Sequence, residues 1–279
     1  MNTSNANTGN ESVAFIGGGN MASAIIGGLL KRGLPTGRIQ VVEPSAEQRA
    51  RLAAQFQVAV HASGGASLED ADLVVWAVKP QTFRQAAEQS RAFAAKALHL
   101  SVAAGIRSGT IAGWLGTQRI VRAMPNTPAL VGQGQTALFA RLAVSAADRL
   151  TVELVMEPTG EFLWLSEEAQ LDAVTALSGS GPAYVFYFIE AMIDAGADMG
   201  LNREQARQLA VGTFVGASIL ARDAAEPPGV LRERVTSRGG TTHAALMSLE
   251  QDDVKARFMR AIGAARARAR ELGDEFGSA

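Results

Sequence analysis

The chain has 279 residues, of which 47% are hydrophobic and 19% charged, so it is long enough to bury a sizeable core and has the balance of a globular protein. Its 26 basic and 27 acidic side chains leave a formal charge of -1, which argues against nucleic acid and anionic membrane surfaces as partners. It contains no Cys, which excludes disulfides, thiolate metal sites and cysteine nucleophiles.

The first residues, Met1 to Glu11, are rich in Asn, Thr and Ser and contain neither a basic segment nor an apolar core. They are predicted to be a flexible leader and not a signal peptide. The longest strongly apolar stretch, Ala183 to Ile189, is far shorter than the roughly 18 to 20 residues that span a membrane. We therefore expect a cytoplasmic protein without a membrane span.

From Ser12 to about Leu165, short apolar runs alternate with segments of helical pattern. This alternation predicts βαβ units, and continuous apolar runs are typical of strands that are buried on both faces of a mostly parallel sheet. We expect a doubly wound α/β domain here. Its strands are expected at Val13–Ile16, Ile39–Val42, Leu73–Val78, Ala97–Val102, Ile120–Ala123 and Gly160–Leu165.

After Ser166 the pattern becomes helical, with breaks at Pro182, Pro227-Pro228 and Gly239-Gly240. An all-α domain is therefore predicted to follow the α/β domain. Glu167 and Glu168 are expected to start its first helix, where a carboxylate is favourable to the helix dipole. The expected helices are Leu171–Gly200, Asn202–Asp223, Thr241–Gln251 and Asp253–Leu272.

The helix expected after Pro182 is apolar around nearly its whole circumference. Such a helix must be covered on all sides. A helical domain of roughly 110 residues cannot easily surround it alone, so a second subunit is the natural cover, and we expect an obligate homodimer built on this domain. The apolar side chains are Tyr184, Val185, Phe186, Tyr187, Phe188, Ile189, Met192 and Ile193.

A glycine-rich turn follows the first expected strand and has the pattern G-x-G-x-x-A. In this pattern Gly17 permits the tight turn, Gly19 lets a pyrophosphate approach the backbone, and Ala22 allows the helix to pack closely on the strand. The N–H groups that open the helix then hold the phosphates. A dinucleotide site is therefore expected at Ile16, Gly17, Gly18, Gly19, Asn20, Met21 and Ala22.

Glu43 ends the second expected strand, somewhat beyond the roughly 20-residue interval typical of the residue that binds the adenosine ribose. As a ribose ligand it favours NAD(H), because a carboxylate repels a 2′-phosphate. Ser45 and Arg49 follow, however, and offer a hydroxyl and a charge that suit such a phosphate. The choice between NADP(H) and NAD(H) stays open, and a solvated turn residue is the other interpretation of Glu43.

Three further loops follow expected strands, at the edge where open α/β sheets bind ligands. Each could be only a turn, because Pro and Gly punctuate strands in any case. Their recurrence after successive strands favours a cofactor cleft, with Pro125 and Asn126 lining the nicotinamide. The loops contribute Ala77, Val78, Lys79 and Pro80, then Ala104, then Pro125 and Asn126.

Two breaks dense in Gly and Ser precede helices in the second half, at Ser178 to Pro182 and at Ser237 to Thr242. Exposed N–H groups at a helix start, with hydroxyls nearby, suit a carboxylate ligand. Plain capping of the helices by these Ser and Thr side chains is the alternative interpretation, and for either break alone it would suffice.

Five segments of the chain, in order, resemble the signature segments of pyrroline-5-carboxylate reductases. They are Val78–Pro80, Ala103–Gly105, Met124–Pro128, Ser178–Ala183 and Val235–Thr242, the last continued by Ala245-Leu246 and Leu249-Glu250. The resemblance runs from Val13 to about Leu272 without a large insertion. It implies a Rossmann-like, NAD(P)-binding α/β domain over residues 12–166 and an all-α domain for substrate binding and dimerisation over residues 167–275.

The resemblance also implies an activity, the reduction of 1-pyrroline-5-carboxylate to L-proline by hydride transfer from NAD(P)H, the last step of proline synthesis. By similarity, Thr242 is the catalytic residue and hydrogen-bonds the ring nitrogen, while the turn before it binds the substrate carboxylate. A homodimer is implied, with a decamer, a pentamer of dimers, as the larger assembly. The implied substrate-binding residues are Ser237, Gly239, Gly240, Thr241 and Ser180.

The chain departs from the family pattern at Arg238, where Pro is usual, and at His243, where an apolar residue is common. A protonated cyclic imine is already an electrophile, so hydride transfer needs positioning more than a strong acid. That requirement agrees with the small number of His residues. His61 and His99 are expected to be structural, and His243 is the one candidate for a general acid.

Two other function classes are weighed against this one. A two-domain dehydrogenase of hydroxy acids or ketoacids commonly needs a Lys in its helical domain, and Lys255 is the only Lys after Lys96, which weighs against that class. A dinucleotide sensor or scaffold without turnover is the second alternative. No metal site is expected, because Glu190, Asp194 and Asp198 recur along one helix without a His.

Overall fold

The structure is a computed structural model and describes residues 11–277. The expected leader, apart from Glu11, and the last two residues of the short tail lie outside the described residues. The chain divides into two compact units. The first comprises the residues up to Ser180 together with those from Ala265 onward, and the second comprises Gly181–Ala264.

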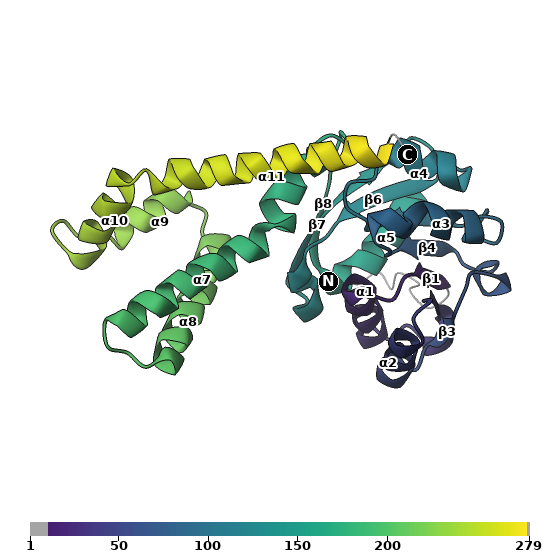
Figure 1. The fold of residues 1–279 in the computed structure, drawn as a ribbon, viewed down its shortest axis with the longest axis horizontal. Helices are drawn as coiled ribbons and strands as arrows, with labels where there is room; N and C mark the ends of the chain where they lie inside the picture. Colours follow the sequence, from purple (N-terminus) through teal and green to yellow (C-terminus); the bar gives the residue numbers. More distant parts are fainter. Residues whose placement is uncertain (1–10, 278–279) are drawn as a thin grey trace, which may run out of the picture. The chain divides into compact units, whose positions relative to one another are not determined.

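The first unit contains one eight-stranded sheet with the strand order β3-β2-β1-β4-β5-β6-β7-β8 (Figure 1). All neighbouring strands are parallel except β6 and β7, which are antiparallel. The order changes direction between β1 and β4, which is where doubly wound sheets form a crevice for ligands. The strands are β1 (Val13–Ile16), β2 (Ile39–Val42), β3 (Ala59–His61), β4 (Leu73–Trp76), β5 (Leu98–Ser101), β6 (Ile120–Met124), β7 (Gly134–Ala140) and β8 (Gly160–Trp164).

Helices cover both faces of this sheet. Alternate strand residues such as Phe15 and Val75 pack with α1, α2 and α5, while their neighbours such as Ile16 and Trp76 pack with α3 and α4. The six expected strands are confirmed to within two residues at each end. The helices of this unit are α1 (Asn20–Lys31), α2 (Ala46–Phe56), α3 (Pro80–Ser90), α4 (Ser108–Leu115), α5 (Ala146–Met156) and α6 (Gln170–Val174).

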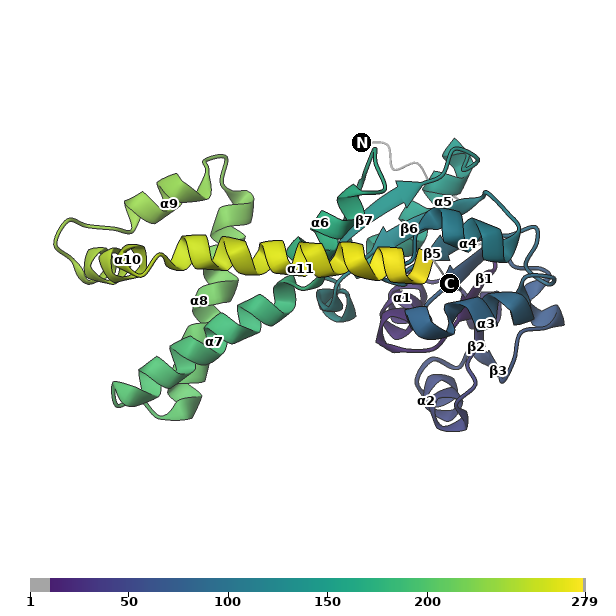
Figure 2. The ribbon, with the colours of Figure 1, turned by 45° about the horizontal axis from the view of Figure 1, so that its top comes forward.

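Short helical turns complete the first unit. A π-helical turn, η5 (Thr175–Gly179), follows α6 directly. The last turns of α11 (Val254–Gly277), from Ala265 onward, also belong to this unit and lie beside α4 (Figures 1 and 2), where Phe276 packs against the buried cluster of α3 and α4. The 3-10 turns are η1 (Thr36–Arg38), η2 (Ala66–Leu68), η3 (Thr127–Val131) and η4 (Glu157–Thr159).

The second unit is all helical and buries few of its own side chains. Helices α7 and α8 form a hairpin whose crossing is tight, because a Cβ added at Gly196 would lie 2.9 Å from Ala206 Cβ. Phe258 packs edge-on against Tyr184 and Phe188. The helices of the second unit are α7 (Gly181–Asp198), α8 (Arg203–Asp223), α9 (Pro228–Arg234), α10 (Thr241–Gln251) and the first part of α11 (Val254–Gly277).

Three elements were not expected, and the expected helix Leu171–Gly200 is divided into α6, η5 and α7 (Gly181–Asp198). Strands β3 and β7 were not expected, because β3 has only three residues and β7 opens with Gly, Gln and Thr before its apolar residues. Helix α9 forms where Pro227-Pro228 suggested only a break. It begins at Pro228, and Pro is tolerated in the first turn of a helix because that N–H has no partner inside the helix.

No helix among residues 11–277 combines the length and the apolar character needed to cross a membrane.

Candidate active site

The glycine-rich loop joins β1 to α1 at the carboxyl edge of the sheet. Gly17 has a φ of +95°, and a Cβ on it would lie 2.6 Å from the Ala77 carbonyl oxygen, so only glycine fits. Gly19 precedes Asn20 as the N-cap of α1, and no side chain caps this helix. The N–H groups of its first turn are therefore available to a ligand.

The surroundings of this loop fit a bound pyrophosphate. A Cβ on Gly19 would meet no atom within 4 Å, so the space in front of the backbone is open. A Cβ on Gly18 would lie 2.4 Å from Leu52 Cδ1, and Ala22 is fully buried against the core, so both positions need small residues. Met21 packs partly buried against the same core. The tight turn at Gly17 and the close packing of Ala22 are as expected, and pyrophosphate binding at Gly19 stays a prediction.

The other expected cofactor residues lie at the same edge of the sheet. Parallel pairing places the ends of β1, β2, β4 and β5 side by side, with Ile16 opposite Val42 and Trp76, and Trp76 opposite Ser101. Glu43, Ala77 and Ala104 follow these ends. The loop after β4 continues through Val78 and Lys79 into Pro80, the first residue of α3. The structure therefore brings these residues together along one edge.

Glu43 is held by backbone donors. Its Oε2 accepts from the Gly18 N–H at 2.9 Å, and its Oε1 accepts from the Ser45 N–H at 2.9 Å. The Ser45 hydroxyl accepts from the Gln48 N–H and caps α2. Arg49 donates to the carbonyl oxygens of Glu43 and Pro44 at 2.8 and 2.7 Å. The carboxylate thus faces the glycine-rich loop, and the Arg49 guanidinium is engaged with main chain.

The loop after β6 lies against the segment that precedes α7. The buried side chain of Asn126 accepts from the Gln135 N–H at 2.9 Å and donates to the Ser178 carbonyl oxygen at 3.0 Å. Pro125 is buried beside it. Ser180, expected to bind substrate, is the C-cap residue of η5 and belongs to the same compact unit as the glycine-rich loop.

The second break, before α10, belongs to the other unit. Gly239 has a φ of +75°, and the Gly240 N–H donates to the Ser237 carbonyl oxygen at 3.0 Å, which closes the turn. Gly240 is the N-cap of α10, and no side chain caps the helix. Capping by Ser or Thr, the alternative interpretation, is therefore wrong for this break. The first N–H groups of α10, including that of Thr242, remain available to an acceptor.

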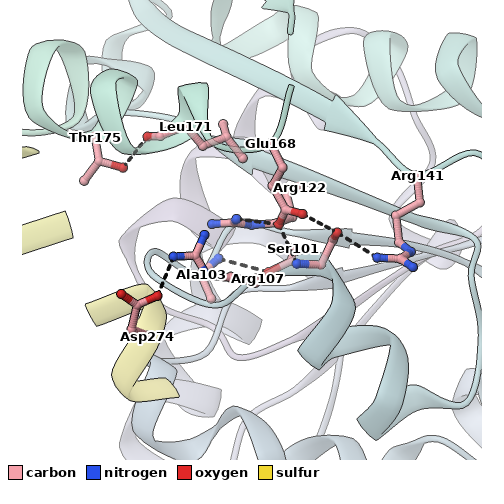
Figure 3. A network of polar contacts seen from close by, with 10 residues as sticks. Ser101, Ala103, Arg107, Arg122, Arg141, Glu168, Leu171, Thr175 and Asp274 are labelled. Carbon is pink, nitrogen blue, oxygen red and sulfur yellow. Dashed lines mark hydrogen bonds and ion pairs between the residues drawn. The ribbon is translucent and has the colours of Figure 1, made fainter. Parts of the chain in front are cut away.

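A network of charges around the buried Arg122 side chain was missed by sequence reasoning (Figure 3). Glu168 accepts from the N–H and hydroxyl of Ser108, the first residue of α4, at 2.5 and 2.6 Å, and it pairs with Arg122 of β6 at 2.7 Å. Glu168 thus stabilises the start of α4 and not, as expected, the start of its own helix. Arg107, in the loop before α4, pairs with Asp274 of α11 at 2.7 Å.

The pKa values reflect this burial. Burial lowers the pKa of Arg122, but a guanidinium stays protonated in proteins. Burial by itself would raise the pKa of Glu168, yet the hydrogen bonds from Ser108 and Arg122 outweigh it, and the pKa lies below its ordinary value. An Arg inside the apolar strand Ile120–Met124 was the available signal, because Arg is almost never fully buried without a partner.

His61 and His99 make contacts that fit the structural roles expected of them. His99 is buried and accepts at Nδ1 from Trp76 Nε1 at 3.0 Å, and burial lowers its pKa to about 4, so it stays neutral. His61 Nε2 lies 2.8 Å from Gln40 Oε1 on the neighbouring strand. His243 lies in the first turn of α10.

The chain is similar to known reductases over nearly its whole length. Family models match residues 168–272 (pyrroline-5-carboxylate reductase dimerisation) and residues 12–105 (NADP oxidoreductase, coenzyme F420-dependent). The pyrroline-5-carboxylate reductase of Pseudomonas aeruginosa is 44% identical over 267 residues, which cover 95% of this chain and 98% of that protein.

Solved structures agree. A pyrroline-5-carboxylate reductase from Coxiella burnetii matches with a TM-score of 0.87 and 37% identity, over 94% of this chain and 98% of its own. The Plasmodium falciparum enzyme, solved with NADP bound, matches with a TM-score of 0.86 and 29% identity, over 95% of this chain and 98% of its own.

Proposed function

The chain belongs to the pyrroline-5-carboxylate reductase family, and from that premise we propose that it reduces 1-pyrroline-5-carboxylate to L-proline with a nicotinamide cofactor. The observation that carries the site assignment is a pair of helix starts without side-chain caps, α1 after the glycine-rich loop and α10 after the Ser237 turn. Free N–H groups at a helix start bind anions, here the cofactor phosphates and the substrate carboxylate.

The chemistry divides between cofactor and protein. The bound dihydronicotinamide supplies the hydride that adds to the imine carbon of the substrate. The protein holds the ring in place. The hydroxyl of Thr242 hydrogen-bonds the ring nitrogen, and the turn formed by Ser237, Gly239, Gly240 and Thr241 holds the carboxylate. Because the protonated imine is already electrophilic, orientation supplies most of the acceleration.

The cofactor lies along the carboxyl edge of the sheet in this proposal. The loop Ile16 to Ala22 binds the pyrophosphate, Glu43 and Ser45 bind the adenosine ribose, and the loops after β4, β5 and β6 line the nicotinamide side. Those loops contribute Ala77, Val78, Lys79, Pro80, Ala104, Pro125 and Asn126.

We further propose that NADH is preferred to NADPH. The Glu43 carboxylate occupies the Gly18 and Ser45 N–H groups that could otherwise donate to a 2′-phosphate. It also adds a negative charge beside the place where that phosphate would lie. Arg49 supports the opposite preference, but its guanidinium is engaged with two carbonyl oxygens.

The chain forms a homo-oligomer through its helical domain. We propose residues 12–166 as the cofactor domain and 167–275 as the domain for substrate binding and dimerisation. A decamer built as a pentamer of dimers and a cytoplasmic location complete the proposal.

Substitution of Thr242 tests the assignment. With pyrroline-5-carboxylate as substrate, Thr242→Val should lower kcat/KM by about 10- to 100-fold, because it removes one hydrogen bond to a charged group and keeps the shape. Thr242→Ser should retain most of the activity. Ser248→Ala, an exposed change on the same helix, is the matched control. Unchanged turnover in Thr242→Val would remove Thr242 from its role. Tight cofactor binding by the unmodified protein without turnover would favour the dinucleotide sensor instead.

A further inference from the structure

The Asn126 side chain forms a bridge inside the first unit. It is only 8% exposed. Its oxygen accepts from the Gln135 N–H at the start of β7, and its nitrogen donates to the Ser178 carbonyl oxygen in η5, at 2.9 and 3.0 Å. The acceptor atom and one of the two amide hydrogens are therefore already used by the protein.

The segment that this bridge holds is not a regular helix. In η5 the Ser180 N–H donates to the Thr175 carbonyl oxygen at 2.9 Å, five residues back, and the Ser178 hydroxyl donates to the Val174 carbonyl oxygen at 3.2 Å. Single π-helical turns are rare and occur frequently at functional sites. Such a turn depends on contacts outside itself to keep its geometry.

A second contact fixes the same segment. A Cβ added at Gly179 would lie 2.5 Å from Met124 Cε, so the backbone of η5 lies directly against the end of β6. Asn126 and Met124 belong to one loop and strand end. They therefore hold Ser178 and Gly179, the two residues that precede Ser180, from neighbouring positions.

We propose that the Asn126 side chain is a positioning residue for the Ser178–Ser180 segment, so that it governs the binding of the cyclic imine more than the binding of the cofactor. This inference rests on the proposed function and on the expectation, from the family resemblance, that Ser180 is a substrate-binding residue. In the proposed function, the main chain of Pro125 and Asn126 lies beside the nicotinamide. The bridge thus links the cofactor loop to the substrate segment.

Two substitutions separate the two arms of the bridge. Asn126→Ala removes both hydrogen bonds, whereas Asn126→Asp keeps the acceptor for Gln135 and places a carboxylate against the Ser178 carbonyl oxygen. Gln135→Ala is the matched control, because it removes an exposed side chain and leaves the Gln135 main-chain N–H in place. NADH affinity is measured by fluorescence titration, and KM for pyrroline-5-carboxylate and kcat by NADH oxidation.

Both Asn126 variants should raise KM for the imine by roughly 10- to 100-fold, because a small displacement of a positioning group has effects of that size. The main chain of Asn126 is unchanged in both variants, so their dissociation constants for NADH should rise by a clearly smaller factor than the KM for the imine. Gln135→Ala should match the unmodified protein in both measurements.

The pH profile gives an independent readout that a purely structural role would not move. The carboxyl introduced by Asn126→Asp can donate to the Ser178 carbonyl oxygen once it is protonated, and burial raises the pKa of a carboxyl. The ratio of its KM to that of the unmodified protein should therefore fall as pH is lowered from about 7.5 to about 5.5. The ratio for Asn126→Ala should stay flat.

Several results would overturn the proposal. NADH affinity that weakens as much as the imine KM rises would place the side chain in the cofactor site. An unchanged KM in both variants would remove the positioning role, and loss of the folded state in both would reduce the bridge to a folding element. If the unmodified protein does not turn over the imine, the proposed function itself fails, which is a separate outcome.

Discussion

At the end of β2, the Glu43 carboxylate accepts from two backbone N–H groups, those of Gly18 and Ser45. In the proposed site this carboxylate lies where the adenosine end of the cofactor binds. A ribose with free hydroxyls can donate to it, and a 2′-phosphate cannot. We therefore propose that cofactor preference is set at the scale of this one residue.

Glu43→Ser should shift the preference toward NADPH. It removes the charge and frees the N–H groups of Gly18 and Ser45, so the ratio of kcat/KM for NADH to that for NADPH should fall by roughly 10- to 100-fold, equivalent to about 1.4 to 2.7 kcal/mol. Initial rates with both cofactors give this ratio. Glu47→Ser, an exposed change of the same charge on α2, is the matched control, and an equal shift there would point to net charge alone.

Among the elements, the start of α4 depends on a residue that is distant in sequence. Glu168 binds the N–H and hydroxyl of Ser108 and neutralises the buried Arg122. These contacts join α4, β6 and the segment before α6 (Figure 3). Arg107 and Asp274 tie the last turn of α11 to the same region. The network therefore connects several elements. Its loss should lower the free energy of unfolding before it lowers the rate of the reaction.

Glu168→Ala should lower the free energy of unfolding by about 3 to 5 kcal/mol, because it leaves the buried Arg122 guanidinium without its partner. Urea unfolding at fixed protein concentration measures this free energy of unfolding. Glu167→Ala, at an exposed neighbour, is the control. A loss below about 1 kcal/mol, the value of an exposed pair, would contradict the assigned burial of the network.

The same network predicts a dependence on pH. The pKa of Glu168 is lowered in the folded protein, from an ordinary value of 4.5. The contribution of Glu168 to the free energy of unfolding is therefore complete above pH 4.5. It is lost as the pH falls through the lower pKa of the folded state. Glu168→Gln should lose less stability than the unmodified protein over that acid range.

For the whole molecule, the second unit leaves many apolar side chains uncovered. On α8, Val211, Val215 and Ile219 recur every four residues and are 36%, 54% and 44% exposed. Phe186 and Tyr187 of α7 are 61% and 68% exposed. A single chain rarely leaves so much apolar surface in water, and the family match over residues 168–272 is to a dimerisation model. A second copy of the chain is the natural cover.

Val215→Asp should therefore weaken the homo-oligomer. A charge placed in an apolar interface should cost on the order of 3 kcal/mol, which raises the dissociation constant about a hundredfold. Sedimentation velocity over a range of concentrations measures the change. Ser218→Asp, an exposed change on the same helix, is the control. An unaltered association constant for Val215→Asp would exclude this face of α8 from the interface.

The sequence by itself determined the fold class, six of the eight strands and the residues of the glycine-rich loop. These features are local, since apolar runs, a helix start and a glycine that must adopt a positive φ can be recognised within a few neighbouring residues. It also pointed to the uncovered helix α7 and thus to an oligomer. The sequence did not predict the short edge strand β3 or strand β7, which is antiparallel to β6. β3 has only three residues and β7 opens with Gly, Gln and Thr, so pairing with neighbouring strands stabilises both.

Only the tertiary structure decided how distant residues are paired. Glu168 lies 60 residues from Ser108, and Arg107 lies 167 residues from Asp274. Asn126 meets Ser178 across 52 residues. Periodicity indicates which face of an element is buried, but it does not identify the polar group that this face contacts on the neighbouring element. Those pairings arise when the sheet is assembled, and they decide the orientation of Glu43, the start of α4 and the bridge from Asn126 to η5.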